Sequence, residues 1–448
     1  MQGPDPSPPT RPPLYLQRHM LVLLTLGYAG GVPLEMAFNI VPTWASAAAW
    51  NVVDIGRLSL AKLPYAFKVL WAPVTDHCGV PGFRGLGRRR SWLLLTQTLC
   101  LALLGALAWN MDGRGGGLAP HAMMLLLGVL VFASATQDIV ADAYRAEILQ
   151  PRELGAGASV FVTGARLASV IGGAGALILA GRLEGSPSLS DWRWSLSIGL
   201  LAASTLLGMV GTLLGREPPR PQGMAHGFAG SVVQPLALLI RAWGMRLPML
   251  LAFVTLYRLP DSLAGAMNSP LLVQGLGYAL EDIGWIRQAF GFSMSIVGAM
   301  LGGWLVSRWS LTRCLWIFGT LQAASNAGFL LMAEAFHASV QVKAAAAPPL
   351  TPLVAVIAVE NTCGGLVACG FVAWMMSVCD RRATATQYAL LTSMMAVGSS
   401  LSGWLGGWMV HHLDYVPFYA LTIAAAVPGM ALIPTLRPGS AGLVNRPA

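Results

Sequence analysis

The stretch "ASATQDIVADAYRAE", residues 133–147, continues an apolar run that begins near Met123. It nevertheless contains polar and ionisable side chains, namely Gln137, Asp138, Asp142 and Arg145. Charges inside an apolar run are costly unless they face a partner or water. The solvent that surrounds this run therefore decides how the stretch is interpreted, and the composition of the chain identifies that solvent.

The composition is that of a membrane protein. The chain has 448 residues, of which 55% are hydrophobic and only 10% are charged, and its mean hydropathy is +0.62. A soluble domain usually contains about 25% charged residues. Apolar stretches of about 18 residues or more, long enough to cross a bilayer as a helix, recur along the chain. Strand-like alternation is absent, which argues against a barrel, so the sequence predicts an all-α integral membrane protein.

Twelve transmembrane segments are predicted, and the basic residues between them give an orientation. If the N-terminus is cytoplasmic, most loop arginines lie on the cytoplasmic side, and the opposite side has only Arg114, Arg182, Arg193 and Lys343. This asymmetry follows the positive-inside rule, so we expect both termini in the cytoplasm. The segments centre near Tyr28, Leu63, Cys100, Leu130, Ser169, Leu206, Leu259, Met294, Asn326, Cys363, Val397 and Ala425.

A charged, proline-rich connection, "GREPPRPQGMAHG", falls between the sixth and seventh segments. We expect an N-terminal six-helix half over residues 1–215, a cytoplasmic linker over 216–245, a C-terminal six-helix half over 246–437 and a cytoplasmic tail over 438–448. The loops of the two halves correspond weakly. Two six-helix repeats are typical of the major facilitator fold, which we therefore predict.

The connection between the second and third segments resembles the Gly/Pro–Asp–basic loop signature of the major facilitator superfamily. Its residues are Asp76, Gly87, Arg88, Arg89 and Arg90. The second half has Ser307 where the first half has Asp76. We expect this loop, with Asp142 and Arg145, to take part in cytoplasmic gating.

Motifs for other chemistry are absent from the sequence. The lysines fit no Walker A pattern, and the six cysteines form no CxxC pair, so we interpret them as helix-packing residues. The net charge of +9 comes from loop arginines rather than from a nucleic-acid site. We expect a monomeric secondary transporter that is not an enzyme and has no cofactor, no resident metal and no nucleic-acid partner.

Ionisable residues at membrane depth are candidate functional residues. Asp138, Asp142 and Arg145 recur at i, i+4 and i+7, which places them on one helix face, with Gln137 beside it. Asp142 and Arg145 lie near the cytoplasmic end, where they either form a structural ion pair between segments 4 and 5 or belong to the gate. Asp138 lies deeper, and we expect it to carry a proton or to orient substrate.

Two further carboxylates lie in segments that line the central cavity of the facilitator fold. Glu35 is in segment 1 and Glu360 is in segment 10. A carboxylate shielded from water can hold a proton at neutral pH. Alternatively, Glu35 pairs with Lys62 or Arg57, and Glu360 hydrogen-bonds to Asn361.

The remaining buried candidates are basic or aromatic. Arg258 and Asp261, three residues apart in segment 7, either pair with each other or contact substrate. Arg166 and Arg287 lie in apolar segments. Because a buried arginine needs an anion, we expect a carboxylate of the protein or of the substrate beside each of them. An aromatic ring with a hydroxyl suits a sugar or peptide ligand. Tyr28 and Tyr257 are the candidates for such a contact.

Several stretches together resemble the AmpG-type muropeptide permeases of the major facilitator superfamily, over nearly the whole chain. They are "GYAGGVPL" (27–34), "YAFKVLWAPVTD" (65–76), "GRRRSWLLLTQ" (87–97), "ATQDIVADAYRAE" (135–147), "LYRLPDSLAGAM" (256–267), "LQAASNAGFLL" (321–331), "ENTCGGLVACGFVA" (360–373) and "TATQYALL" (384–391). The resemblance implies proton-driven import of GlcNAc–anhydro-MurNAc peptides across the bacterial inner membrane. This import serves cell-wall recycling and, in some bacteria, β-lactamase induction.

Carried over residue by residue, the resemblance points to the helix 1 glycines and to three polar pairs. These are Gly27, Gly30 and Gly31, then Gln137–Asp138, Arg258–Asp261 and Glu360–Asn361. The chain departs from the family pattern at Glu35, where an apolar residue is usual, and at Arg258, where lysine is expected. The alternatives are a facilitator permease for a siderophore or another small solute, and a non-transporting membrane sensor on the same scaffold.

Overall fold

The computed structural model describes residues 16–77, 79–80, 84–112, 118–149, 153–218, 240–241, 243–342, 349–378 and 384–436. Every regular element in these ranges is helical, which confirms the predicted all-α class. Each of the twelve predicted segments lies in a helix or in a run of consecutive helices. Nine of the described helical runs are long and apolar enough to cross a membrane. The runs around Leu63, Leu259 and Val397 are helical but more polar.

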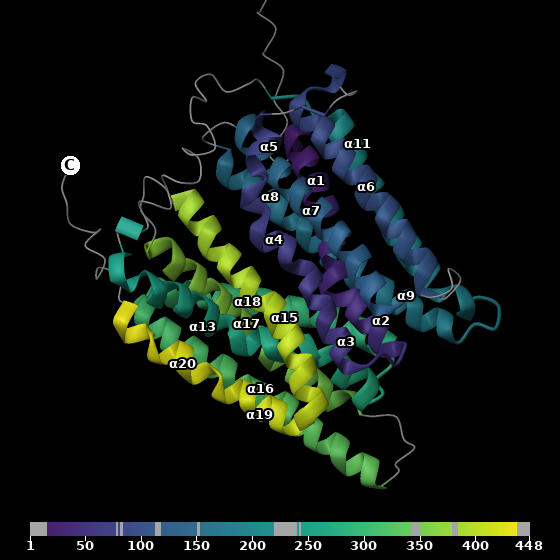
Figure 1. Cartoon of the computed structure of the whole chain (residues 1–448), viewed down its shortest axis with the longest axis vertical. Coiled ribbons are helices and arrows are strands. Elements are labelled where there is room, and N and C mark those ends of the chain that lie inside the picture. Colours follow the sequence, from purple (N-terminus) through teal and green to yellow (C-terminus); the bar gives the residue numbers. More distant parts are fainter. Residues whose placement is uncertain are drawn as a thin grey trace, which may run out of the picture.

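The first six segments lie in the described residues up to 218, and we call this part of the structure the N-terminal half (Figure 1). The second segment is broken into short helices, whereas the third and fourth are long and continuous. Their elements are α1 (Arg18–Glu35), η2 (Met36–Ile40), α2 (Val41–Ala47), α3 (Val52–Arg57), η3 (Leu58–Lys62), α4 (Leu63–Phe67), η4 (Lys68–Leu70), α5 (Ala72–His77), η5 (Arg84–Leu86), α6 (Arg88–Met111), α7 (Pro120–Ile148), α8 (Leu154–Leu167), η6 (Ala168–Ala174), α9 (Gly175–Glu184), η7 (Ser190–Trp192), α10 (Arg193–Ser204) and α11 (Leu206–Leu214).

The other six segments form the C-terminal half, from residue 240 onward. Their elements are η9 (Gly244–Arg246), α13 (Leu247–Pro270), η10 (Leu271–Gly275), α14 (Leu280–Ile283), η11 (Gly284–Phe290), α15 (Gly291–Val306), α16 (Leu311–Val342), α17 (Leu350–Val378), α18 (Thr384–Leu413), α19 (Tyr415–Ala424), α20 (Ala426–Ala431) and η12 (Ile433–Leu436). The predicted boundaries of the halves stay predictions, because residues 219–239 and 437–448 lie outside the described residues.

Within the described residues, four of the segments contain a π-helical stretch, and all four contribute to the space between the halves. The stretches are η2, η6, η10 and η11. Pro33 lies inside α1 shortly before η2, and Pro270 ends α13 directly before η10. A proline inside a helix removes one backbone hydrogen bond and crowds the preceding turn, so the helix widens locally. Such widened turns often occur at functional sites.

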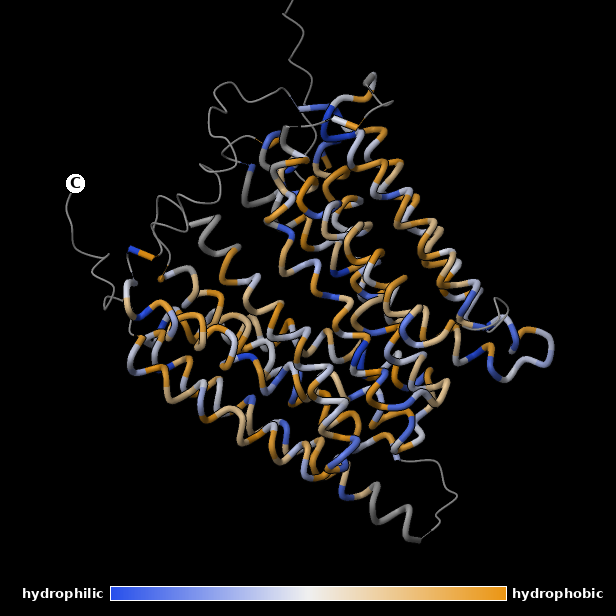
Figure 2. Tube along the Cα trace, viewed as in Figure 1, coloured by the Kyte–Doolittle hydropathy of each residue, from blue (hydrophilic) through white to orange (hydrophobic). Residues whose placement is uncertain are grey.

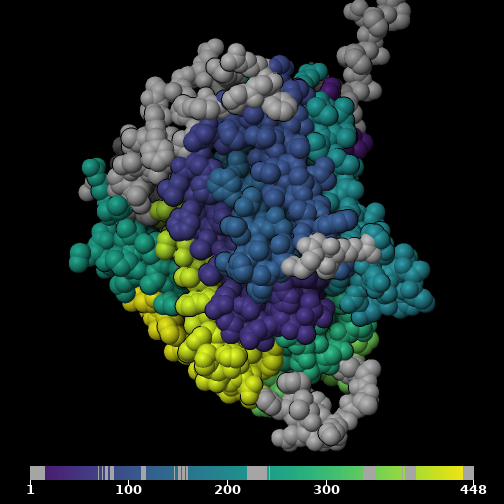
Figure 3. All heavy atoms as spheres, turned by 45° about the vertical axis from the view of Figure 1, so that its right-hand side comes forward, coloured from purple at the N-terminus to yellow at the C-terminus, as the bar shows by residue number. Residues whose placement is uncertain are grey.

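The halves meet at one end of the molecule, where α2, α3 and η10 lie; we call it the closed end. Figure 1 shows α2 and α3 beside the elements of the C-terminal half there, and α3 packs against α18. Figure 3 shows this part of the N-terminal half against the C-terminal end of the chain. Thr43 and Ser269 lie 3.0 Å apart across this contact. The Gln274 amide donates to the carbonyl oxygens of Ser46 and Trp50, at 3.0 and 2.9 Å.

Backbones also approach closely at the closed end. A Cβ atom on Gly56 of α3 would lie 2.4 Å from the carbonyl oxygen of Gly403 and 3.0 Å from the Cα of Gly407, both on α18. The exposed pair Arg182–Glu281 joins α9 to α14 at 2.8 Å. Glycines are thus required where the two halves touch, since any side chain would force them apart.

Hydrophobic residues run along the helices, and hydrophilic residues gather at helix ends and where the halves meet (Figure 2). One buried cluster includes side chains of both halves, among them Met36, Val41, Leu263 and Met267. In a bilayer, the exposed apolar faces of the helices contact lipid, while these buried side chains hold the helices together. The packing therefore leaves a space between the halves that is closed at one end and is lined by both polar and apolar side chains.

Candidate functional site in the cavity between the halves

A cavity of about 670 Å³ lies between the two halves. A more polar side pocket of about 270 Å³ shares part of its wall, between η2, η6, η11 and α17. The volume of the cavity is within the range of small-molecule sites, about 300–1,000 Å³, and the side pocket is slightly smaller than that range. The elements that line the cavity and side pocket come from segments 1, 2, 5, 7, 8, 10 and 11, so both halves contribute.

One wall of the cavity is apolar and aromatic. Leu34, Phe38 and Tyr65 line it. The ammonium group of Lys62 lies 3.9 Å from the centre of the Phe38 ring, a cation–π contact. The combination offers a surface against which the apolar face of a sugar ring could pack, next to a positive charge.

Glu35 lines both the cavity and the side pocket. Its two carboxylate oxygens accept hydrogen bonds from the Asn39 amide, at 2.8 Å, and from the Ser169 hydroxyl, at 2.5 Å. A Cβ on Gly173 would lie 2.8 Å from Glu35 Oε2, so only glycine leaves room for this carboxylate. Of the two alternatives for Glu35, the structure does not show the one in which Glu35 pairs with Lys62 or Arg57.

The reason is that both cations have other contacts. Arg57 pairs with Asp54 one helical turn away, at 2.9 Å, and Lys62 lies over Phe38. The sequence signal that was missed is Asn39, which lies four residues after Glu35 and therefore on the same helix face.

Arg166 and Arg287 also line the cavity and the side pocket. The Arg166 guanidinium lies 5.3 Å from the centre of the Phe292 ring. Arg287 donates from Nη1 to the Ser269 hydroxyl at 2.8 Å. Among the described residues, no ion pair joins either arginine to a carboxylate. Both guanidinium groups are therefore placed to receive an anion from the cavity.

Arg258 and Asp261 pair with each other at 2.9 Å. This contact is one of the two alternatives predicted for them. Asp261 also accepts from the Gln322 amide at 2.8 Å, which ties α13 to α16. Both members of the pair line the cavity. The charges of this pair offset each other, so the charge that the site presents comes from the cations Lys62, Arg166 and Arg287 and from the carboxylates Glu35 and Glu360 of the cavity and side pocket.

Glu360 and Asn361 line the side pocket, as Glu35 does. The Asn361 amide donates to Glu360 Oε2 at 2.7 Å and to the Ile357 carbonyl oxygen at 3.0 Å. The structure thus shows the predicted hydrogen bond and also places Glu360 against the pocket. The two alternatives for this residue are compatible.

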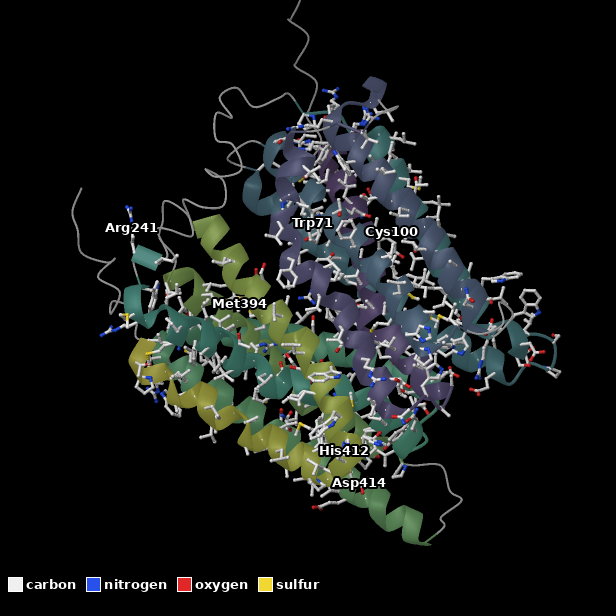
Figure 4. The ribbon with its side chains drawn as sticks, in the orientation of Figure 1. Trp71, Cys100, Arg241, Met394, His412 and Asp414 are labelled. Atoms are coloured by element: carbon white, nitrogen blue, oxygen red, sulfur yellow. The ribbon has the colours of Figure 1, made fainter. Side chains whose placement is uncertain are left out.

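Asp138 forms an ion pair with Lys68 of η4, and it is not among the residues that line the cavity. Nearby, the hydroxyls of Tyr65 and Ser134 lie 3.0 Å apart, and Trp71 donates to Thr136 Oγ1 at 3.1 Å. Figure 4 shows Trp71 inside the N-terminal half and Met394 on α18 of the other half. Sequence reasoning missed Lys68, although a lysine in an apolar segment is a signal.

Asp142 and Arg145 pair at 2.9 Å, but the pair lies within α7 and does not join segments 4 and 5. The predicted structural latch is therefore wrong in this form. The contact with segment 5 is made by the Arg145 guanidinium, which lies 4.8 Å from the centre of the Phe161 ring on α8. Residues three apart on a helix are neighbours, so the local pair forms at little entropic cost.

The predicted glycines of α1 pack against the same neighbour. A Cβ on Gly27 would lie 2.0 Å from the Phe161 carbonyl oxygen, and one on Gly31 would lie 2.7 Å from the Ala168 Cβ. Gly30 instead faces α7, where its Cβ would lie 3.9 Å from Gln137 Nε2. The Gln137 amide is 1% exposed and has no hydrogen-bond partner among the described residues.

The two predicted tyrosines lie away from the central cavity. Tyr28 donates to Ser204 Oγ at 2.8 Å, between α1 and α10. Tyr257 donates to the Leu315 carbonyl oxygen at 2.8 Å and stacks on Phe371. Both face neighbouring helices of their own half, because helix 1 and helix 7 positions alternate between the cavity and the helix interfaces.

The predicted cytoplasmic loop is held by two carboxylates. Arg88 and Arg89 donate to Glu147 of α7, at 3.1 and 2.5 Å, and Arg89 is 1% exposed. The backbone N–H groups of Arg89 and Arg90 donate to Glu217, at 2.8 and 3.1 Å. An anion at a helix N-terminus is favourable, so Glu217 caps α6. The side chain of Asp76 lies outside the described part of the chain.

Comparison with known proteins agrees with this geometry. The sequence family described as acetyl-coenzyme A transporter 1 matches residues 19–115. Over 423 residues, the chain is 35% identical to the anhydromuropeptide permease of Escherichia coli (strain K12). The alignment covers 94% of this chain and 80% of that permease.

Two solved structures share the fold at low sequence identity. The nucleoside transporter NupG (D323A mutant) gives a TM-score of 0.65 at 13% identity, covering 95% of this chain and 100% of that chain. A D-xylose–proton symporter gives a TM-score of 0.65 at 12% identity, covering 95% and 98%. All these proteins are transporters rather than enzymes. The chain has the major facilitator fold and belongs to the anhydromuropeptide permease family.

Proposed function

We propose that this protein is a proton-coupled importer of anhydro-muropeptides, GlcNAc–anhydro-MurNAc disaccharides with or without a short peptide. The observation that carries the substrate proposal is the cavity itself. It combines an aromatic wall at Phe38 and Tyr65 with three cations that no ion pair joins to a carboxylate among the described residues, Lys62, Arg166 and Arg287. A muropeptide presents sugar rings and at least one carboxylate, and it complements both features.

The proposed proton coupling rests on carboxylates in or near the cavity. Glu35 and Glu360 line the side pocket, and Asp138 of α7 pairs with Lys68 of the second segment. Protonation of a carboxylate that faces a cation releases that cation, and an anionic substrate can then bind it. Glu360 and Asp138 are the carboxylates that we assign to the proton, while Glu35 contributes to the substrate wall.

We place the protein in the bacterial inner membrane as a monomer, with both termini in the cytoplasm. The loop arginines support this orientation, because cytoplasmic loops carry an excess of basic residues. The closed end then faces the periplasm, and the structure is an inward-facing form. Asp76, Arg88, Arg89, Arg90, Asp142 and Arg145 are assigned to the cytoplasmic gate, which closes when the halves approach at the other end.

Uptake of labelled GlcNAc–anhydro-MurNAc tests the proposal in a permease-deficient bacterium that expresses this chain, with and without a protonophore. We expect uptake above the empty-vector background and its loss with the protonophore. Absence of uptake, with the protein shown to be in the membrane, would contradict the muropeptide assignment. Uptake that the protonophore leaves unchanged would contradict the proton coupling alone.

A further inference from the structure

A chain of hydrogen bonds leads from the cavity to the closed end. Arg287 Nη1 donates to Ser269 Oγ at 2.8 Å. Ser269 Oγ lies 3.0 Å from Thr43 Oγ1, and Thr43 donates to the Asn39 carbonyl oxygen at 2.6 Å. Since the single hydroxyl proton of Thr43 is used on Asn39, Ser269 donates to Thr43 and offers its lone pairs to Arg287.

This chain crosses the boundary between the halves. Arg287 belongs to η11 and Ser269 to α13, both in the C-terminal half, whereas Thr43 belongs to α2 in the N-terminal half. Thr43 and Ser269 are 0% and 3% exposed, so water does not replace the bond between them. Arg287, in contrast, lines both the cavity and the side pocket. A group that a ligand can reach is thus tied to a contact that forms only when the closed end is closed.

We propose that Ser269 competes with an anionic ligand for Arg287, and that it competes effectively only while Thr43 holds it across the closed end. The inference rests on the proposed function, because it requires an anionic ligand in the cavity. When the closed end opens, Thr43 leaves and the Ser269 hydroxyl is free to turn. The Arg287 guanidinium then serves the ligand, and affinity is highest in the outward-facing form.

Closure reverses this preference. Thr43 again fixes the Ser269 hydroxyl, Ser269 accepts from Arg287, and the ligand anion loses one charged donor. Ligand affinity therefore falls as the inward-facing form appears, and this fall promotes release of the ligand on the cytoplasmic side. By linkage, the ligand in turn favours the form in which Arg287 is free of Ser269. Ser269 and Thr43 are positioning residues, because neither is required to touch the ligand.

Equilibrium binding to the purified full-length protein tests the competition, with GlcNAc–anhydro-MurNAc as the acid and its lactyl carboxamide as the neutral control. Ser269→Ala and Thr43→Val remove the competitor or its anchor. We expect the acid to bind roughly tenfold more tightly to both variants, because each substitution frees Arg287 to make one more charge-assisted hydrogen bond to the ligand. Uptake is expected to fall in both variants, since release is slowed, while carboxamide affinity is unchanged.

Two matched variants serve as controls. Thr43→Ser keeps the hydroxyl and is expected to bind and transport as the wild type does. Thr255→Val removes a hydroxyl from the same helix, α13, at a residue that donates to the Leu251 carbonyl oxygen of its own helix and is not among the residues that line the cavity or the side pocket. Its affinity for the acid is expected to stay within about twofold of wild type, the change typical of a residue outside the interaction.

The outcomes separate this inference from the proposed function. If the wild type binds the acid but Ser269→Ala and Thr43→Val bind it no more tightly, the competition is overturned and the muropeptide assignment stands. If the variants tighten binding of acid and carboxamide equally, the effect is not exerted through Arg287, and the competition is again overturned. If the wild type binds neither compound, the proposed function fails and the competition fails with it.

Discussion

Lys68 and Asp138 form an ion pair that joins the broken second segment to α7, with the two side chains 28% and 24% exposed. The pair lies within the N-terminal half, beside the hydroxyl contact of Tyr65 with Ser134. Since Tyr65 lines the cavity, a change in this pair reaches the cavity wall through one residue. The pair is therefore where a proton could alter the shape of the site.

Charge removal and charge exchange distinguish a proton role of Asp138 from a structural role. We expect Asp138→Asn to lower uptake at least tenfold, in the range found for loss of a proton-transfer group. The exchange Lys68→Asp with Asp138→Lys restores the ion pair but moves the carboxylate to another helix. We expect the exchanged protein to fold and to remain inactive. Wild-type uptake by Asp138→Asn, with unchanged pH dependence, would contradict the proton role.

Arg166 is expected to bind the carboxylate of the substrate. Arg166→Gln should raise the KM for GlcNAc–anhydro-MurNAc roughly tenfold or more, the cost of one hydrogen bond to a charged group. Uptake of the lactyl carboxamide should change little, because it lacks the anion. Arg57→Gln is the matched control, since Arg57 is paired with Asp54 and does not line the cavity. An equal loss for acid and carboxamide would show that Arg166 only supports the fold.

Glu360→Gln keeps the shape of the side chain and prevents it from releasing or taking up a proton. We expect the variant to bind ligand and to exchange it across the membrane, but not to accumulate it against a gradient. The measurement compares counterflow with proton-driven uptake in the same vesicles. Glu334→Gln on α16 is the control, because Glu334 is exposed and lies outside the cavity lining. Normal accumulation by Glu360→Gln would remove Glu360 from the proton path.

The closed end depends on the glycines of α3 and α18. A Cβ on Gly403 would lie 2.3 Å from the Ser59 side chain, so Gly403→Ala should force the halves apart at this end. In a background without the native cysteines, a cysteine at Ser262 in the cavity should become reactive to an impermeant maleimide added outside cells. Gly105→Ala on α6 is the control, because nothing lies within 4 Å of its Cβ position. Unchanged labelling would contradict the assignment of this contact as the closure.

The buried ion pair of Arg89 with Glu147 is expected to stabilise the N-terminal half. Arg89→Ala leaves the Glu147 carboxylate short of a partner in a buried site, and breaking such a pair costs about 3–5 kcal/mol. The unfolding temperature of the purified protein should therefore fall clearly. Arg313→Ala, at an exposed arginine over Trp309, should leave it nearly unchanged. An equal Tm for both variants would exclude a stabilising role.

The fold could be predicted from the sequence because lipid leaves few choices. A chain whose apolar runs are long enough to cross a bilayer must satisfy its backbone groups internally, so the runs become helices. The widened turns at η2, η6, η10 and η11 could not be read from periodicity, and they decide which side chains reach the cavity. Glu35 lies in the cavity lining, where the sequence predicted it, but its hydrogen bond from Ser169 on η6 was not predicted.

Local pairs were predicted better than distant ones. Arg258–Asp261 and Glu360–Asn361 are close in sequence, and both contacts are present. The contact of Asp138 with Lys68 joins residues 70 positions apart, and sequence alone gives no register between two helices. Tyr28 and Tyr257 show the same limit, because a mid-helix position does not say which neighbour the side chain faces.

Transport by the purified protein in proteoliposomes is the most direct test of the central claim. The vesicles would contain the full-length chain, with a proton gradient imposed across the membrane and labelled GlcNAc–anhydro-MurNAc supplied on the acidic side. We predict accumulation of the disaccharide above its equilibrium level, abolished by a protonophore and lost in Asp138→Asn. Equilibration without accumulation would contradict proton coupling, and failure of the disaccharide to enter functional vesicles would contradict muropeptide transport itself.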